Sequence, residues 1–318
     1  MTESAFQAAW NFLRTPEELA TKDRAQAWVL PIPYEGTTCY GAGTRDGPAA
    51  ILAASRQIEF YDPELDCEPA MRFGIHTLNA LAPVRGAPEE MIDVVEKTVA
   101  DILGGSPSPQ ILAVLGGEHS LSAGVARGIA HAIPAKNLVA VCLDAHGDLR
   151  DTYEGSRFSH ACAARRILDV CPLFQAGVRS LSLEEARFIR ACKPPTRHGR
   201  SGGVASLRTF SATESAAGPR VLEELAKFVR GKNVYLTIDL DGLDPSIMPA
   251  VGTPEPGGLS WERALEFVRV VTREAASVPA FDVVELAPLP GMHGPDYLAA
   301  TLVYKVMSLA LLGHKSKA

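Results

Sequence analysis

The chain has 318 residues, of which 47% are hydrophobic and 21% are charged, and its formal net charge of −6 is ordinary for a soluble globular protein. No block of like charge suggests nucleic acid or an anionic membrane as a partner, and the apolar stretches are too short or too interrupted for a transmembrane helix. The N-terminus does not resemble a signal peptide and the six cysteines form no CxxC pair, so we expect a cytoplasmic protein with reduced thiols.

Strands and helices are predicted to alternate along most of the chain, after an N-terminal extension of short helices over residues 1–25. Predicted strands cover residues 26–32, 72–77, 111–115, 137–143, 174–178, 234–240 and 280–286. Predicted helices cover residues 48–60, 88–103, 120–133, 161–170, 183–192, 219–230, 260–276 and 295–312. The Pro- and Gly-rich segment 193–215 is expected to be an irregular loop. This alternation implies right-handed βαβ units, so we expect a single α/β domain over residues 1–318, a three-layer α/β/α sandwich with a mostly parallel central sheet.

Four predicted strands end in side chains with the chemistry of a metal site. Three of these strand ends carry the six candidate metal ligands, His119, Asp144, His146, Asp148, Asp239 and Asp241, and the fourth carries the carboxylate Glu285. The carboxyl ends of parallel strands lie along one edge of a sheet, where open α/β proteins bind their ligands. Residues two apart in an extended segment also point to the same side. We therefore expect these side chains to converge.

Each candidate also has an ordinary structural interpretation. His119 could cap the following helix, and Asp241 with Gly242 forms a good turn. The stretch from Asp144 to Asp148 could, taken alone, equally be a solvated junction between a strand and a loop. Glu285 is harder to explain in this way, because an unpaired charge in a buried strand is costly unless a cation compensates it. The four strand ends together favour a metal site with more than one ion.

The types of ligand indicate which metal is expected. Two imidazoles and four carboxylates without a thiolate suit a hard or borderline ion such as Mn²⁺ better than a structural zinc ion. Six side chains are too many for one catalytic ion with an open position, but they suit two ions that share carboxylates. Such an anionic cluster favours a cationic substrate and counts against a phosphoesterase.

Several motifs, in this order, resemble the signatures of the ureohydrolase family, which contains the arginases and agmatinases. They are Gly116-Gly-Glu-His-Ser120, Asp144-Ala-His-Gly-Asp148, Ser159-His160, Asp239-Leu-Asp-Gly-Leu-Asp-Pro245, Gly252-Thr-Pro-Glu-Pro-Gly-Gly258 and Val284-Glu-Leu-Ala-Pro288. The resemblance extends from about residue 31 to residue 305. It implies an α/β/α sandwich, a trimer or hexamer, two Mn²⁺ ions per chain, and hydrolysis of a guanidino compound to urea and an amine.

The resemblance also implies a role for each site residue. One ion would bind His119, Asp144, Asp148 and Asp239, and the other would bind Asp144, His146, Asp239 and Asp241. Glu285 would bind the substrate guanidinium, which keeps its charge at neutral pH. Asp148 would move a proton to the leaving amine, and His160 would exchange protons with water at the mouth of the site. Without the resemblance, His160 would be interpreted as a surface-loop histidine.

The loop over residues 149–160 resembles that of agmatinases. Asp151 and Glu154 could face the free ammonium of agmatine. Arg150 and Arg157 could instead bind the carboxylate of a guanidino acid, and any of these charges on a solvated loop could be without effect.

The favoured hypothesis is a hydrolase that converts agmatine to putrescine and urea, a reaction of polyamine biosynthesis. One alternative is the same reaction on guanidinobutyrate, guanidinopropionate or arginine, and another is hydrolysis of formimidoylglutamate. An alternative of a different class is a catalytically silent family member that acts as a binding or assembly subunit.

Overall fold

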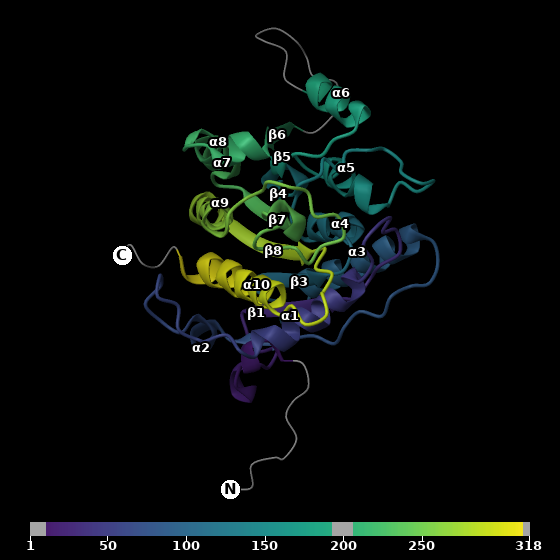
Figure 1. Ribbon diagram of the computed structural model, residues 1–318. Helices are drawn as coiled ribbons and strands as arrows, with labels where there is room; N and C mark the ends of the chain where they lie inside the picture. Colours follow the sequence, from purple (N-terminus) through teal and green to yellow (C-terminus); the bar gives the residue numbers. More distant parts are fainter. Residues whose placement is uncertain (1–10, 193–205, 314–318) are drawn as a thin grey trace, which may run out of the picture.

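Within the described part of the chain, eight parallel strands form one sheet in the order β2-β1-β3-β8-β7-β4-β5-β6 (Figure 1). The computed structural model describes residues 11–192 and 206–313. The strands are β1 (Ala27–Ile32), β2 (Ile75–Thr77), β3 (Ile111–Gly116), β4 (Leu138–Leu143), β5 (Leu173–Val178), β6 (Leu207–Ser211), β7 (Asn233–Asp239) and β8 (Ser277–Val284). The expected α/β sandwich with a parallel sheet is therefore confirmed.

The inner strands are buried on both faces of the sheet. Every residue of β3 and β4 is buried, and only the first residue of β7 and of β8 is not. Helices that cross over between parallel strands cover both faces of a sheet, which is why these strands have continuous apolar runs instead of alternating ones.

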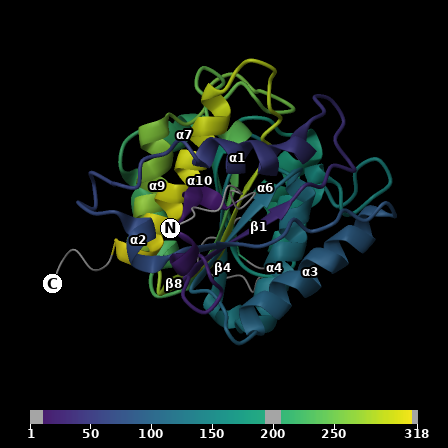
Figure 2. The ribbon, with the colours of Figure 1, turned by 90° about the horizontal axis from the view of Figure 1, so that it is seen from below.

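Helices cover the sheet on both sides. They are α1 (Gly47–Ser55), α2 (Pro69–Phe73), α3 (Pro88–Gly104), α4 (Ser122–Ala132), α5 (Ala163–Leu168), α6 (Leu183–Cys192), α7 (Ala212–Ala216), α8 (Arg220–Val229), α9 (Trp261–Glu274) and α10 (Gly294–Leu312). Helices α1, α9 and α10 lie on one face, and α3 and α4 on the other (Figure 2). Two hydrophobic cores, one on each face, fix the sheet in place.

Helix α10 is long and apolar enough to cross a membrane when only length and composition are considered. Its buried residues, which include Leu302, Val303 and Val306, belong to the core on its face of the sheet, and the helix packs against α1. A core helix of a globular protein passes the same test of composition, so α10 is explained by its packing in the fold.

The N-terminal part and the segment 193–215 differ from the expectation. Within residues 11–25, the expected short helices are two 3₁₀ turns, Phe12–Arg14 and Glu17–Leu19, while residues 1–10 lie outside the described part. Residues 193–205 also lie outside it, but the rest of the expected loop forms β6, at the edge of the sheet, and most of α7. The first turn of α7 has a capping box between Ser211 and Glu214, a pattern that is visible in the sequence.

Candidate metal centre

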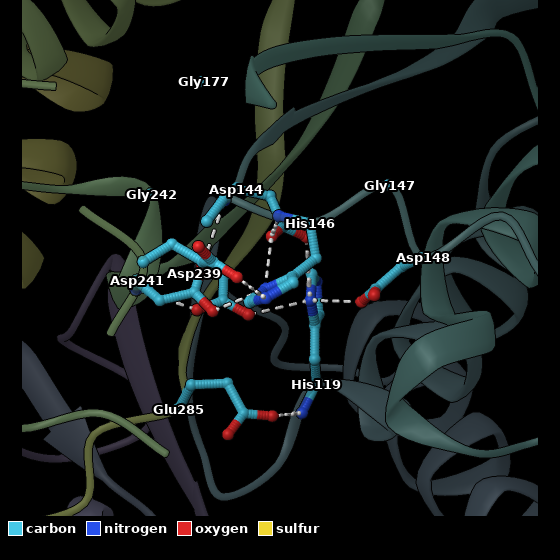
Figure 3. A network of polar contacts seen from close by, with 12 residues as sticks. His119, Asp144, His146, Gly147, Asp148, Gly177, Asp239, Asp241, Gly242 and Glu285 are labelled. Atoms are coloured by element: carbon cyan, nitrogen blue, oxygen red, sulfur yellow. Dashed lines mark hydrogen bonds and ion pairs between the residues drawn. The ribbon is translucent and has the colours of Figure 1, made fainter. Parts of the chain in front are cut away.

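The candidate ligands lie at the carboxyl ends of four neighbouring strands. β3, β8, β7 and β4 are adjacent in that order, so their ends meet at one edge of the sheet. His119 follows β3, and Asp144 directly follows β4. Asp239 is the last residue of β7, and Glu285 directly follows β8. The predicted convergence is therefore present, and the side chains point toward one another (Figure 3).

Two glycines allow neighbouring segments to approach the backbone of Asp144 closely. A Cβ atom on Gly177 would lie 2.9 Å from the carbonyl oxygen of Asp144, and Gly177 has a φ of +98°. A Cβ atom on Gly242 would lie 2.9 Å from the amide nitrogen of Asp144. Side chains larger than hydrogen at these positions would displace the central carboxylate of the cluster.

His119 faces three carboxylates with a single ring nitrogen. Its Nδ1 lies 3.1 Å from Oδ2 of Asp239, and 3.3 Å from Oδ2 of both Asp144 and Asp148. This nitrogen is buried and makes no hydrogen bond with a described residue. On the other side of the ring, Nε2 lies 3.1 Å from the Thr237 hydroxyl. A buried nitrogen that makes no hydrogen bond but lies 3.1–3.3 Å from three carboxylate oxygens fits a metal cation between them.

His146 faces a second group of carboxylates. Its Nδ1 lies 2.8 Å from Oδ2 of Asp241 and 3.8 Å from Oδ1 of Asp144. The two oxygens of Asp144 thus face different histidines, since Oδ2 lies near His119. A carboxylate that bridges two metal ions would have this orientation.

Backbone N–H groups hold these carboxylates in place. The N–H of His146 donates to Asp144 over 2.6 Å, and the N–H of Asp241 donates to Asp239 over 2.9 Å. Asp241 accepts a further bond of 3.1 Å from the N–H of Ala145. The cluster is therefore fixed by the main chain and does not depend on flexible side-chain partners.

The carboxylates are buried without a compensating basic side chain. Asp144 is fully buried and Glu285 is 9% exposed. Burial and the neighbouring carboxylates raise the pKa of Asp144 to about 6, and burial and Glu118 raise that of Glu285 to about 8. Burial and neighbouring aspartates also raise the pKa of Asp239. No described lysine or arginine forms an ion pair with the cluster, whose ion pairs are with histidines. Buried negative charge of this kind requires a cation to compensate it.

The same carboxylates also raise the pKa of His146, whereas burial acts on it in the opposite direction. Burial alone would lower the pKa of His146, but its hydrogen bond to Asp241 and the nearby charges of Asp144 and Asp148 outweigh burial and raise it to about 11. The imidazole would therefore carry a proton at neutral pH. A metal ion has to displace this proton, because only a neutral imidazole binds a metal.

Cys142, one of the six cysteines expected to be reduced, is a buried neighbour of the cluster. Its Sγ lies close enough to His119 and Asp144 to share a metal with them, and it donates to Oδ2 of Asp144 over 3.7 Å. Burial and Asp144 raise the pKa of this thiol well above its ordinary value. Because the thiolate is the form that binds metals, we interpret Cys142 as a neutral donor to Asp144.

A cavity opens above the cluster. Its lining residues are Thr38, Cys39, Tyr40, Gly41, His119, His146, Asp148, Arg150, Tyr153, His160, Ala161, Asp239, Asp241, Gly252, Thr253 and Glu285. His160 is one of these residues, with Nε2 3.6 Å from Sγ of the exposed Cys39 and its ring edge-on to Tyr153. Five of the six expected metal ligands, all except Asp144, thus line one cavity together with His160 and Glu285.

Asp151 and Glu154 are not among the described residues that line this cavity. Asp151 accepts hydrogen bonds from Arg166 over 2.6 Å and from Arg157 over 3.2 Å. Glu154 lies at a turn with a φ of +46°. Arg150 does line the cavity, where its guanidinium lies over the ring of Tyr153. The geometry supports a structural role for Asp151.

Two site residues have backbones in the left-handed region. The φ angles are +50° for Asp148 and +68° for Glu285. Residues other than glycine rarely adopt this conformation, and when they do they cluster at functional sites. Both side chains line the cavity, as expected if the backbone is strained to direct them there.

Two buried or partly buried charges that support the site carry no clear signal in a single sequence. Glu118 is fully buried and accepts from the backbone N–H and the hydroxyl of Thr37, over 2.7 Å each. Arg179 donates to backbone carbonyls that include those of Asp241 and Glu255. These contacts join segments far apart in the sequence, so local patterns do not reveal them.

Known proteins resemble this chain over most of its length. A model of the arginase family matches residues 25–309. An N(1)-aminopropylagmatine ureohydrolase of Synechocystis is 37% identical over 295 residues, which cover 92% of this chain and 91% of that protein. An agmatinase of Pyrococcus horikoshii is 31% identical over 297 residues, with 92% and 95% covered. The crystal structure of agmatine ureohydrolase of Thermoplasma volcanium has a TM-score of 0.80 and 28% identity, with 96% of each chain covered.

Proposed function

We propose that this chain, which belongs to the arginase family, cleaves a linear guanidino amine into urea and a smaller amine. Proteins with similar sequences are named ureohydrolases and agmatinases. The observation that carries the proposal is the buried cluster of carboxylates around Nδ1 of His119 and Nδ1 of His146, beneath an open cavity. A cationic substrate suits this acidic site.

We propose that the cluster holds two Mn²⁺ ions. One would be held by His119, Asp144, Asp148 and Asp239, and the other by Asp144, His146, Asp239 and Asp241. Nitrogen and oxygen donors of this kind suit Mn²⁺, and the split orientation of Asp144 supports two ions instead of one. When bound, the ions would lower the pKa of a water molecule and act as Lewis acids.

Glu285 would bind the guanidinium group of the substrate. Its carboxylate is fixed by the N–H of His119 over 2.6 Å and lines the cavity beside the cluster. The planar guanidinium donates several N–H groups and cannot lose its charge at neutral pH. Its arrival would favour the ionised form of Glu285, whose pKa of about 8 is raised chiefly by burial.

Two further residues would move protons. Asp148 lies 3.3 Å from Nδ1 of His119 and faces the cavity, where it would take a proton from the attacking water and pass it to the leaving amine. His160, which also lines the cavity, would then exchange protons between the leaving amine and solvent, because an imidazole can both accept and donate a proton.

Two substrates of this class are supported by different observations. The resemblance of the loop over residues 149–160 to the corresponding loop of agmatinases favours agmatine. The comparisons favour the N(1)-aminopropyl derivative, because the relative of that name is 37% identical and the agmatinase 31%. Tyr40, 82% exposed at the cavity, offers an accessible aromatic ring to the cationic tail of a longer amine. We favour the aminopropyl derivative and take agmatine as the second candidate.

Release of urea by the Mn²⁺-loaded protein tests the function and the substrate together. The panel consists of N(1)-aminopropylagmatine, agmatine, arginine, guanidinobutyrate and guanidinopropionate, with formamide measured from formimidoylglutamate. We expect the highest kcat/KM for the first, then agmatine, and little urea from the other three. Preference for a compound with a carboxylate would contradict the substrate class. No product from any of them would support a silent binding or assembly subunit.

We further propose that the chain forms a trimer or hexamer, as the family resemblance implies, and that it acts in the cytoplasm, as expected from the N-terminus and the cysteines. Mass measurement by light scattering on the purified protein tests the assembly, and a monomeric mass would contradict it.

A further inference from the structure

The hydroxyl of Thr37 connects the buried carboxylate of Glu118 to the ring of His160. Thr37 Oγ1 donates to Oε1 of Glu118 over 2.7 Å. The same oxygen accepts the backbone N–H of His160 over 2.9 Å and lies 3.2 Å from its Nδ1. This chain of contacts joins the loop after β1 to the segment that contains His160.

Glu118 fixes the direction of these hydrogen bonds. Its Oε2 accepts the backbone N–H groups of Gly36 and Thr37 over 2.6 and 2.7 Å, and its Oε1 accepts the hydroxyl of Ser120 over 2.5 Å, so donors surround the carboxylate. The hydroxyl of Thr37 has one proton, and the contact with Glu118 uses it. Thr37 Oγ1 is therefore an acceptor toward His160, and Nδ1 of His160 has to supply a proton to that contact.

We propose that Thr37 is a positioning residue that holds neutral His160 as the tautomer with the proton on Nδ1. This leaves the lone pair of Nε2 toward the thiol of Cys39, which lines the cavity. Nε2 is then free to accept a proton from the leaving amine or from water. What this transfer serves rests on the proposed function, but the tautomer itself does not.

Among the described contacts of His160 Nδ1, one other hydroxyl could set the opposite tautomer. Oγ of Ser159 lies 3.3 Å from Nδ1 of His160, and a proton donated from Ser159 would place the ring proton on Nε2. The Thr37 contact is shorter at 3.2 Å, and its direction is fixed by Glu118. Ser159 thus offers a matched control variant.

Nitrogen NMR of the full-length protein labelled with ¹⁵N-histidine measures the tautomer directly. Solid-state spectra, with a diamagnetic divalent ion in place of Mn²⁺, distinguish protonated from unprotonated ring nitrogens. The His160 signals are assigned by their loss in His160→Asn. We expect protonated Nδ1 in the wild type, Ser159→Ala and Thr37→Ser, and protonated Nε2 or a mixture in Thr37→Val. An unchanged tautomer in Thr37→Val, or a change in Ser159→Ala, would overturn the proposal.

Kinetics on the same variants separate positioning from general damage to the loop. Thr37→Val should lower kcat for urea release about 10-fold and change KM less than about twofold, with Thr37→Ser restoring kcat. Equal kcat values for Thr37→Val and Thr37→Ser would contradict the role in proton transfer. If the wild type releases no urea, the proposed function fails, while the NMR result still decides the tautomer.

Discussion

The backbone N–H of His119 donates to the carboxylate of Glu285 over 2.6 Å, so the segment after β3 and the end of β8 are joined within the cavity. This bond aligns Glu285 beside the proposed metal ligands instead of among them. The residue proposed to bind the substrate is thereby tied to a residue proposed to bind the metal.

Replacing Glu285 with Gln should nearly abolish urea release without removing the metal. Gln keeps an oxygen that accepts the N–H of His119, but it lacks the charge that would pair with the guanidinium. We expect kcat/KM to fall about 100-fold or more. Steady-state kinetics together with metal analysis check this result, and Glu154→Gln serves as a control for loss of a carboxylate outside the cavity. Wild-type kcat/KM in Glu285→Gln would contradict the assignment.

The same substitution should change how the stability of the metal-free protein depends on pH. Burial raises the pKa of Glu285 from 4.5 to about 8, so the native state keeps a proton that the unfolded state has lost. The free energy of unfolding should therefore decrease as pH rises from about 4.5 to about 8. Urea denaturation should find Glu285→Gln more stable than the wild type at about pH 8 and similar to it at about pH 5. Parallel pH profiles would contradict the raised pKa.

Metal binding should release protons. His146, with its pKa raised to about 11 by Asp241 and other carboxylates against the effect of burial, is protonated in the metal-free protein. We expect about one proton or more to leave at pH 7.5, and more near pH 6, where Asp144 also holds protons. Calorimetric titration with Mn²⁺ in buffers of different ionisation enthalpy measures this number. Binding heats that are the same in all buffers would show that no proton is released.

The parallel sheet and the convergence of the strand ends could be predicted from the sequence, because both follow from local patterns and one topological rule. Apolar runs mark the strands, and parallel strands place their carboxyl ends together. This rule alone is sufficient to predict that the segment from Asp144 to Asp148 lies beside Asp239. β6 was missed because four of its five residues are only partly buried at the sheet edge and the strand follows a Pro- and Gly-rich segment.

The surroundings of the ligands could not be predicted in this way. Glu118 holds Thr37, and Arg179 holds the carbonyl of Asp241, through contacts between segments that are distant in the sequence. The direction in which Asp151 points is likewise set by Arg166 on a later helix. Such pairings depend on the packed structure, so a charge on a loop in the sequence does not reveal its partner.

Gly177→Ala should damage the metal centre more than an equivalent substitution elsewhere. Gly231→Ala is the matched control, because Gly231 also has a positive φ, +65°, but its Cβ position is open. Gly231→Ala should cost only the backbone strain, about 1–2 kcal/mol. Gly177→Ala should cost more and weaken Mn²⁺ binding, because its Cβ would meet the carbonyl oxygen of Asp144 at 2.9 Å. Chemical denaturation and metal titration compare them, and equal effects would contradict the role of close packing.

Asp151→Asn should affect stability more than substrate binding. Arg166, 3% exposed, donates to Asp151 over 2.6 Å, and it would lose that charged partner. We expect a loss of about 0.5–1 kcal/mol in unfolding free energy, since Asp151 itself is half exposed. The KM for agmatine and its aminopropyl derivative should change little. A severalfold rise in KM in Asp151→Asn or Glu154→Gln would instead support contact with the amine tail.

The most direct test of the central proposal, a two-metal ureohydrolase centre built from four strand ends, is a metal count with a urea assay on the wild type and Asp239→Ala. Asp239 is proposed to bridge both ions and lies 3.1 Å from Nδ1 of His119. After loading with Mn²⁺ and dialysis, we predict two ions per chain and urea release for the wild type. For Asp239→Ala we predict at most one ion and no urea. Full metal content and urea release in Asp239→Ala would contradict the account.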